Sequence, residues 1–375
     1  GSTWTEVNDM TNTDKNSAAG VNNTAGLAFG GMPEGHTERW NGTSWTETAD
    51  FNTARYSTQG AGASSTSGIV AGGSTPGAPN NVSDVEEFTG DASIGAWSTK
   101  NNMNTARKEL AGAGTATSAL AFGGNTGPEA VAITESFDGT SWTEVNDLNT
   151  AVKHNAGCGA TNTAALSFGG YVTGYIAETE TWNGSSWTEV NDLNTYRYGL
   201  AGFGTNTAAI AAGGHSATGV SALCELWNGS SWTEVGDLND PRGYVNGCAG
   251  ISTAGIVFGG DGPNATANTE TWDGSSWTEV NNLNTARWHM FGAGSQSSAL
   301  GFGGYSPPGY HALTEDWNGA TWVEVADMST GRSGGGSGGV SDATTALAFG
   351  GATPSVTAAT EEWSGSSNTI KVLTD

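Results

Sequence analysis

Short apolar runs alternate along the chain with clusters of glycine, asparagine and serine, and the whole pattern recurs eight times. Each apolar run, such as 119–122 or 346–349, ends in a double glycine. The runs are too short for helices, and their Thr, Val, Trp and Phe residues favour strands. A period of 42 to 51 residues predicts a propeller, a solenoid or an array. The double glycines are Gly30-Gly31, Gly72-Gly73, Gly123-Gly124, Gly169-Gly170, Gly213-Gly214, Gly259-Gly260, Gly303-Gly304 and Gly350-Gly351.

Each unit contains four predicted strands, which the unit at 194–239 illustrates. Its second strand is an unbroken apolar run before Gly213-Gly214, a pattern typical of strands that are buried on both faces. Its third and fourth strands are joined by Asn-Gly-Ser-Ser, and Asn-Gly adopts the positive φ angles that a tight hairpin requires. We therefore expect one antiparallel four-stranded sheet in each unit and no helix.

Two aromatic residues flank this hairpin in every unit but the last and are predicted to face each other. Trp182 and Trp187 are one such pair, and Phe88 and Phe137 take the first place in two other units. Aromatic pairs across a hairpin contribute roughly 0.2–1 kcal/mol each. The remaining tryptophan pairs are Trp40/Trp45, Trp227/Trp232, Trp272/Trp277 and Trp317/Trp322.

Eight such sheets around a central channel form a β-propeller, so the predicted fold is an all-β, eight-bladed propeller occupying residues 1–375 as one domain. The chain starts with an isolated fourth strand at 4–7, and its end lacks the expected tryptophan. We expect the N-terminal strand to complete the eighth blade, because an open solenoid would leave both edges unpaired. Residues 368–375 form either a tail or an alternative closing strand.

The order of these residues resembles the kelch repeat over essentially the whole chain. Gly-Gly is followed by Glu-x-Trp, a second Trp and Asp-Leu-Asn-Thr-x-Arg, with Trp where that family usually has Tyr. The near-identical runs Trp-Asn-Gly-Ser-Ser-Trp-Thr-Glu-Val are similar to kelch-like repeats in virion-associated and surface proteins of marine phages and bacteria. The resemblance implies a binding platform, although a minority of kelch propellers, similar to galactose oxidase, are copper enzymes.

Composition narrows the range of partners and locations. The net charge is −25 and only 13% of residues are charged, which disfavours nucleic acid and anionic membranes as partners. No run is long and apolar enough for membrane insertion. Three cysteines are too few for a disulfide framework and are expected to be packed thiols. With the resemblance, these features lead us to expect an extracellular or virion-surface protein.

Arginine and glutamate recur at fixed positions in the units and are interpreted as architecture. An acid in every unit more often reflects the fold than a cation site, so we expect Arg–Glu pairs that join strands or blades. The arginines are Arg55, Arg107, Arg197, Arg242, Arg287 and Arg332, with Lys15 in the first unit. The glutamates are Glu38, Glu86, Glu135, Glu180, Glu225, Glu270, Glu315 and Glu361.

The candidate binding residues lie outside the repeated pattern. Tyrosine and histidine gather after the double glycines and around the arginine, in connections that antiparallel order places on one face of the propeller. Variable loops on a rigid scaffold commonly carry binding residues, and such side chains combine an apolar surface with a polar tip. The candidate ligand-binding residues are Tyr56, Tyr171, Tyr175, Tyr198, His215, Asp261, Trp288, Tyr305 and Tyr310.

These observations predict a non-catalytic adhesion module that recognises a glycan or another cell-surface polymer. One alternative is a structural module that docks other protein subunits of a larger assembly. A second alternative is an enzyme, a hydrolase or an oxidase, with a site at the channel mouth. No cofactor or metal is expected, because the copper ligands of galactose oxidase cannot be mapped onto the chain and no zinc-type spacing occurs.

Overall fold

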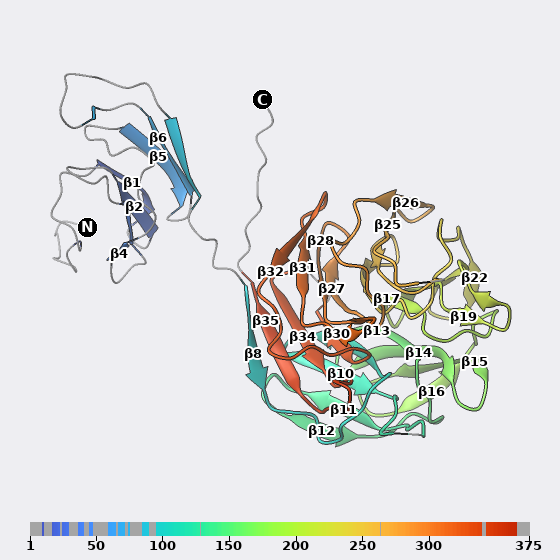
Figure 1. The fold of residues 1–375 in the computed structure, drawn as a ribbon. Helices are drawn as coiled ribbons and strands as arrows, with labels where there is room; N and C mark the ends of the chain where they lie inside the picture. The colour runs from blue at the N-terminus through green and yellow to red at the C-terminus, as the bar shows by residue number, and fades with distance from the viewer. Residues whose placement is uncertain are drawn as a thin grey trace. The chain divides into compact units, whose positions relative to one another are not determined.

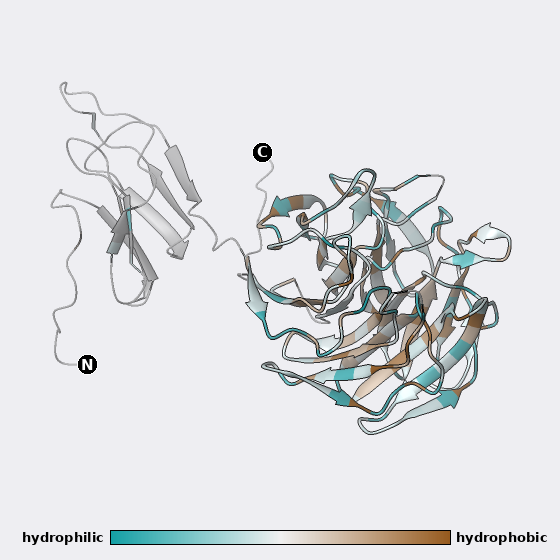
Figure 2. Ribbon diagram, turned by 60° about the horizontal axis from the view of Figure 1, so that its bottom comes forward, coloured by the Kyte–Doolittle hydropathy of each residue, from teal (hydrophilic) through white to brown (hydrophobic). Residues whose placement is uncertain are grey.

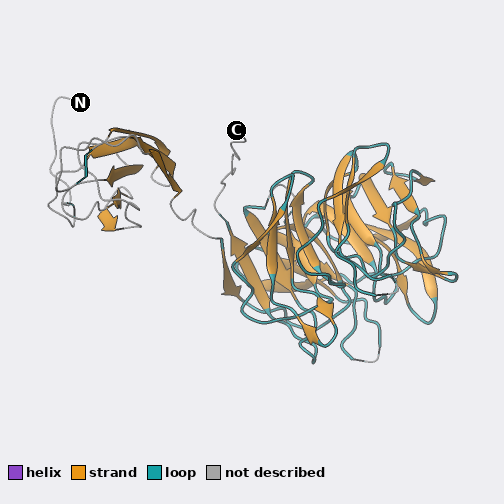
Figure 3. Cartoon of the chain, turned by 45° about the horizontal axis from the view of Figure 1, so that its top comes forward, coloured by secondary structure: helices purple, strands orange, loops and turns teal. Residues whose placement is uncertain are grey.

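The computed structural model describes residue 10 and residues 17–22, 25–29, 37–40, 45–47, 59–64, 67–71, 74–75, 85–89, 95–127, 129–262, 264–339 and 343–365. By its internal contacts the chain divides into two compact units, Gly1–Ser93 and Ile94–Asp375, where one domain was expected. The described residues form strands and loops without a helix (Figure 3). Accordingly, they include no helix that could cross a membrane.

The unit Ile94–Asp375 is a β-propeller of six four-stranded antiparallel blades (Figure 1). We number the blades I to VI around the propeller. Blade I is β33 (Gly336–Gly338), β34 (Thr345–Phe349), β35 (Thr360–Ser364) and β8 (Ala96–Lys100). Blade II is β9 (Ala111–Thr115), β10 (Ser118–Phe122), β11 (Thr134–Phe137) and β12 (Trp142–Val145). Blade III is β13 (Ala156–Thr161), β14 (Ala164–Tyr171), β15 (Tyr175–Trp182) and β16 (Trp187–Val190).

The other three blades follow the same order. Blade IV is β17 (Ala201–Thr205), β18 (Ala208–Ala212), β21 (Cys224–Trp227) and β22 (Trp232–Glu234). Blade V is β23 (Cys248–Ile251), β24 (Ala254–Phe258), β25 (Thr269–Trp272) and β26 (Trp277–Val280). Blade VI is β27 (Phe291–Ser295), β28 (Ser298–Phe302), β31 (Thr314–Trp317) and β32 (Trp322–Val325). Two small hairpins extend blades IV and VI, namely β19 (His215–Ser216) with β20 (Gly219–Val220), and β29 (Tyr305–Ser306) with β30 (Gly309–Tyr310).

The prediction of eight blades in one propeller is therefore wrong, and strand β8 explains the difference. By sequence β8 is the fourth strand of the repeat that supplies β7, yet it pairs with β35 at the other end of the unit. Trp97 consequently lies opposite Trp363, with ring centroids 5.7 Å apart, and not opposite Phe88. Residues 89–96 lack the Asn-Gly or Asp-Gly turn that most other units have, so the sequence does not enforce the local hairpin. The proposed closing strands at 4–7 and 368–375 lie outside the described residues.

The unit Gly1–Ser93 contains the first two repeats as two sheets. One sheet is β1 (Ser17–Asn22), β2 (Ala25–Phe29), β3 (Thr37–Trp40) and β4 (Trp45–Glu47). The other is β5 (Gln59–Ser64), β6 (Ser67–Ala71) and β7 (Val85–Thr89). Trp40 and Trp45 face each other at 5.4 Å, so the repeat pattern holds in this unit as well.

The core of the propeller lies between neighbouring blades, as the predicted burial of each second strand requires. Leu120, Ile210 and Leu300, one from each of three second strands, are fully buried. Apolar strands packed face to face form this interior (Figure 2). The first strands are rich in glycine because the blades approach closely near the axis. A Cβ at Gly112, for example, would lie 2.5 Å from the Ser337 carbonyl oxygen.

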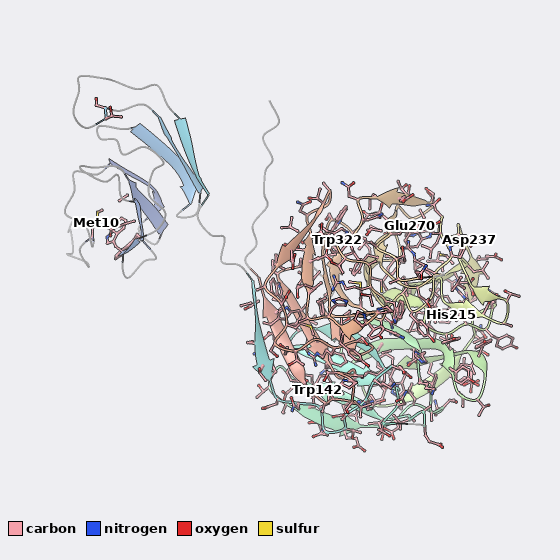
Figure 4. The ribbon with its side chains drawn as sticks, in the orientation of Figure 1. Met10, Trp142, His215, Asp237, Glu270 and Trp322 are labelled. Atoms are coloured by element: carbon pink, nitrogen blue, oxygen red, sulfur yellow. The ribbon has the colours of Figure 1, made fainter. Side chains whose placement is uncertain are left out.

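The predicted aromatic pairs form in five blades of the propeller. Tryptophans of the fourth strands also form hydrogen bonds with the neighbouring blade. Trp182 and Trp187 lie 5.4 Å apart, and Phe137 and Trp142 lie 5.0 Å apart. In five of the six blades the indole N–H of the fourth-strand tryptophan donates to a threonine hydroxyl of the preceding blade. These bonds are Trp97 to Thr314 (3.0 Å), Trp142 to Thr360 (3.1 Å), Trp187 to Thr134 (3.0 Å), Trp232 to Thr179 (3.1 Å) and Trp322 to Thr269 (3.2 Å). Figure 4 labels Trp142 and Trp322.

Trp277 breaks this pattern because blade IV has Cys224 where the other blades have threonine. Among the described side chains, the Trp277 indole nitrogen is a buried donor without a hydrogen-bond partner. We expect Cys224→Thr to raise the free energy of unfolding by about 1 kcal/mol, since it supplies the missing acceptor. Thermal unfolding of the full chain measures the change. The reverse substitution Thr179→Cys is the matched control and should destabilise, and a loss of stability in Cys224→Thr would contradict the interpretation.

The predicted Arg–Glu pairs are present in five blades and are fully buried. Arg197 donates to the carbonyl oxygens of Gly213 (2.7 Å) and Leu223 (2.5 Å) and to Glu225 Oε1 (2.8 Å). Because the arginine precedes the first strand and the glutamate lies on the third, each pair clamps the entering chain to its blade. The pairs are Arg107–Glu135, Arg197–Glu225, Arg242–Glu270, Arg287–Glu315 and Arg332–Glu361. Arg55 and Lys15 lie outside the described residues.

Candidate functional site

One residue from each blade lies in the left-handed backbone conformation beside the propeller axis. These residues are Glu109, His154, Gly199, Tyr244, His289 and Gly334, with φ between 45° and 66°. Hydrogen bonds join them from blade to blade: His154 N–H donates to the Glu109 carbonyl (2.8 Å), and Gly334 N–H donates to that of His289 (3.0 Å). Glycine adopts this conformation without penalty, whereas four non-glycine residues here store strain, which clusters at functional sites.

Glu109 is the carboxylate of this six-residue ring, and three neighbouring side chains contact it. Glu109 accepts from His154 Nε2 (3.0 Å), from Lys108 (3.1 Å) and from the Asn125 amide. Burial alone would raise the pKa of Glu109, but the hydrogen bond and charge of His154, together with Lys108, lower it to about 2. Burial, reinforced by the charge of His154, lowers the pKa of His289 to about 3. The ring therefore holds a fixed carboxylate and a neutral imidazole at neutral pH.

Tyrosine and histidine rings from blades III, IV and V form one continuous cluster around Tyr198. Tyr198 stacks on Tyr175 at 5.2 Å and on His215 at 5.0 Å, and it contacts Tyr171 edge-on at 5.8 Å. The Tyr244 hydroxyl donates to that of Tyr198 at 3.4 Å. Burial, followed by this bond, raises the pKa of Tyr244. We call Tyr171, Tyr175, Tyr198, His215 and Tyr244 the tyrosine–histidine cluster; Figure 4 labels His215.

The ring and the tyrosine–histidine cluster lie at one end of the propeller, which we call the mouth. Backbone pairing holds the residues that follow the double glycines at this mouth. Tyr171, His215 and Tyr305 each form a bridge with a residue just after the repeated arginine position, namely Lys153, Tyr198 and Trp288. Asp261 is bridged to Gly243, and its carboxylate lies 3.1 Å from His215 Nε2. The loops after the double glycines and the segments after the repeated arginine position, which we predicted on one face, are thus paired with each other through their backbones.

A pocket of about 200 Å³ opens beside the ring, between blades VI, I and II. Trp288, Tyr305 and Tyr310 form its aromatic side, with ring centroids 5.5 Å apart for the first pair and 5.2 Å for the second. Lys108, Glu109 and His289 line the rest. Blade I contributes only Ser333, Gly334 and Ala352. Blade VI has Trp288, His289 and Tyr305 at the matching positions, so the small residues of blade I leave the space.

The structure places eight of the nine predicted site residues at one mouth. Tyr171, Tyr175, Tyr198, His215 and Asp261 gather in and beside the tyrosine–histidine cluster. Trp288, Tyr305 and Tyr310 line the pocket, and Tyr56 lies outside the described residues. The prediction did not include Lys108, Glu109, His154, Tyr244 and His289. A signal for the ring existed, because glycine takes the equivalent place at 199 and 334.

The described residues do not assemble a set of metal ligands. No group of three or more His, Cys, Asp or Glu side chains among them is placed to hold a metal ion, although three histidines gather near the mouth. The three cysteines are free thiols. Cys158 and Cys248 line a narrow axial cavity of about 80 Å³, and burial raises the pKa of the Cys248 thiol to about 12. Both thiols are therefore protonated at neutral pH.

The fold defines the class of this protein as a β-propeller of four-stranded antiparallel blades, which is consistent with a binding or docking module. The solved structure of YjhT, a propeller-like structure, is similar in fold. It superposes with a TM-score of 0.58 and 14% sequence identity, covering 70% of this chain and 95% of YjhT. At that identity the likeness concerns the fold alone. No protein-family model matches the sequence, and no curated protein matches it.

Proposed function

We propose that this protein is a kelch-like, non-catalytic binding module that recognises a glycan at its aromatic mouth, in an extracellular or virion-surface setting. The observation that carries the proposal is the gathering of tyrosine, histidine and tryptophan side chains at one mouth, on connections held by backbone bridges. Aromatic rings with polar tips offer the flat apolar faces and hydrogen-bonding groups that sugars match. The arrangement is rigid, which lowers the entropic cost of binding.

The chemistry of the mouth favours binding over catalysis. The thiols of Cys158 and Cys248 line the axial cavity and are protonated, so they are poor nucleophiles. Glu109 is engaged by three partners, and its lowered pKa makes it a weak base. The low pKa of His289 likewise makes it a weak base at neutral pH. These groups are suited to hold a ligand through fixed hydrogen bonds.

A glycan array with the full chain tests the proposal. We expect binding to defined glycans, and Tyr175→Ala should weaken it about tenfold, or ~1.4 kcal/mol, because Tyr175 is exposed and stacked on Tyr198. Tyr196→Ala is the matched control and should bind normally, since Tyr196 is 65% exposed and makes none of the ring contacts of the described mouth. An array without binding, together with a stable complex with a protein from the source, would favour the docking alternative.

A further inference from the structure

The pocket between blades VI, I and II differs chemically from the rest of the mouth. The tyrosine–histidine cluster is filled by its own rings, which stack on one another. The pocket instead has a volume of about 200 Å³ and is lined by Trp288 and Tyr305. Pockets for drug-sized ligands run from roughly 300 to 1,000 Å³, so this one suits a ligand of about one ring.

The aromatic side of the pocket is held in place by its backbone. Trp288 N–H donates to the Tyr305 carbonyl (3.0 Å), and Tyr305 N–H donates to the Trp288 carbonyl (2.9 Å). The β29–β30 hairpin pairs Tyr305 with Tyr310, and Ser306 Oγ lies 2.7 Å from His311 Nε2 at its base. Because the backbone is paired in this way and the rings of Trp288, Tyr305 and Tyr310 contact one another, stacking a ligand on them costs little conformational entropy.

The charges of the pocket cancel and leave adjacent donors and acceptors. Lys108 Nζ lies 3.1 Å from Glu109 Oε1, and the lowered pKa of Glu109 keeps the carboxylate ionised. A lysine donates only and a carboxylate accepts only, whereas each sugar hydroxyl does both. A row of neighbouring hydroxyls therefore matches both members of the pair, while a ligand carboxylate, which only accepts, would match Lys108 but not Glu109.

We infer that this pocket binds one neutral pyranose ring of a glycan, stacked on Trp288 and Tyr305 and hydrogen-bonded by Lys108 and Glu109. This inference rests on the proposed function and assigns its sugar class and its anchoring subsite. The tyrosine–histidine cluster then provides the surface over which the rest of the glycan extends.

Titration calorimetry of the full chain with methyl pyranosides tests the inference. The probes are methyl glucoside, galactoside, mannoside and N-acetylglucosaminide, with methyl glucuronide as the acidic counterpart. We expect at least one neutral glycoside to bind, with the glucuronide at least about tenfold weaker. Trp288→Ala should abolish this binding and Trp288→Phe should restore part of it, whereas Tyr196→Ala, outside the ring contacts of the mouth, should leave it unchanged. Glu109→Gln should narrow the gap between the glucuronide and the neutral sugars.

The outcomes separate this inference from the proposed function. If the chain binds glycans on an array but the binding is lost in Tyr175→Ala and retained in Trp288→Ala, the mouth binds sugars and the pocket is not the anchor. A preference for the glucuronide, or no binding of any monosaccharide beside clear array binding, also overturns the inference. If neither assay detects binding, the proposed function fails as well.

Discussion

Replacing Arg197 by valine is expected to lower the free energy of unfolding by about 3–5 kcal/mol, because it leaves the buried carboxylate of Glu225 without its charged partner. The substitution also removes the donors that satisfy the carbonyl oxygens of Gly213 and Leu223. Valine is the informative replacement because Val152 occupies the same place in blade III. There the Thr150 N–H donates to Glu180 Oε1 (3.2 Å), the oxygen that the arginine engages in blade IV.

Denaturant unfolding of the full chain measures this effect, and a double mutant identifies its cause. Adding Glu225→Gln to Arg197→Val should recover part of the loss, since an amide is less costly to bury unpaired than a charge. If the single variant loses less than about 1 kcal/mol, the pair is not a structural clamp. If the second substitution recovers nothing, the loss comes from packing and from the carbonyl oxygens, not from the stranded charge.

A cysteine pair at positions 98 and 362 is expected to form a disulfide, because Ser98 and Glu362 are cross-strand partners in β8 and β35. The cross-link closes a very long loop, so it should stabilise the propeller by about 2–4 kcal/mol. Mass spectrometry after digestion detects the bond, and unfolding with and without reductant measures the stabilisation. The native cysteines remain in place, since all three are free thiols away from this edge.

The matched control pairs Ser98→Cys with Glu87→Cys. Position 87 would face position 98 if β8 formed the local hairpin that an eight-bladed propeller requires, as Thr181 faces Thr188 in blade III. We expect no disulfide in this second variant. A bond between positions 87 and 98 would show that β8 forms the local hairpin with β7 and would contradict its pairing with β35.

The repeat alone predicted the blade but not the number of blades. The apolar second strand, the tryptophan pairs and the Arg–Glu clamps follow from local pattern, and the structure confirms each of them in most units of the propeller. The number of blades depends on which fourth strand pairs with β35, the third strand of the final repeat. Near-identical sequence makes several fourth strands compatible with that edge, so pairing over such a long separation cannot be read from one unit.

For the candidate site, the sequence predicted which face carries it but not the ring beside the axis or the pocket. Variable residues such as Tyr171 and Trp288 could be assigned to one face, because antiparallel order fixes which connections share an end. The ring beside the axis depends instead on backbone conformation, which a histidine or a glutamate does not reveal in sequence. The pocket depends on what three blades leave empty, and only the small residues of blade I hinted at it.

The pairing of β8 with β35 also determines how the propeller responds to mechanical tension. Ala96, at the start of β8, lies opposite Ser364, at the end of β35, so the chain enters and leaves the propeller at neighbouring points. A pull on these two ends acts across the strands, along the direction of their hydrogen bonds. The ladder would therefore open one pair at a time from Ala96 and Ser364 towards Lys100 and Thr360. Blade I would be the first to yield, while the clamps of blades II, IV, V and VI remained unloaded.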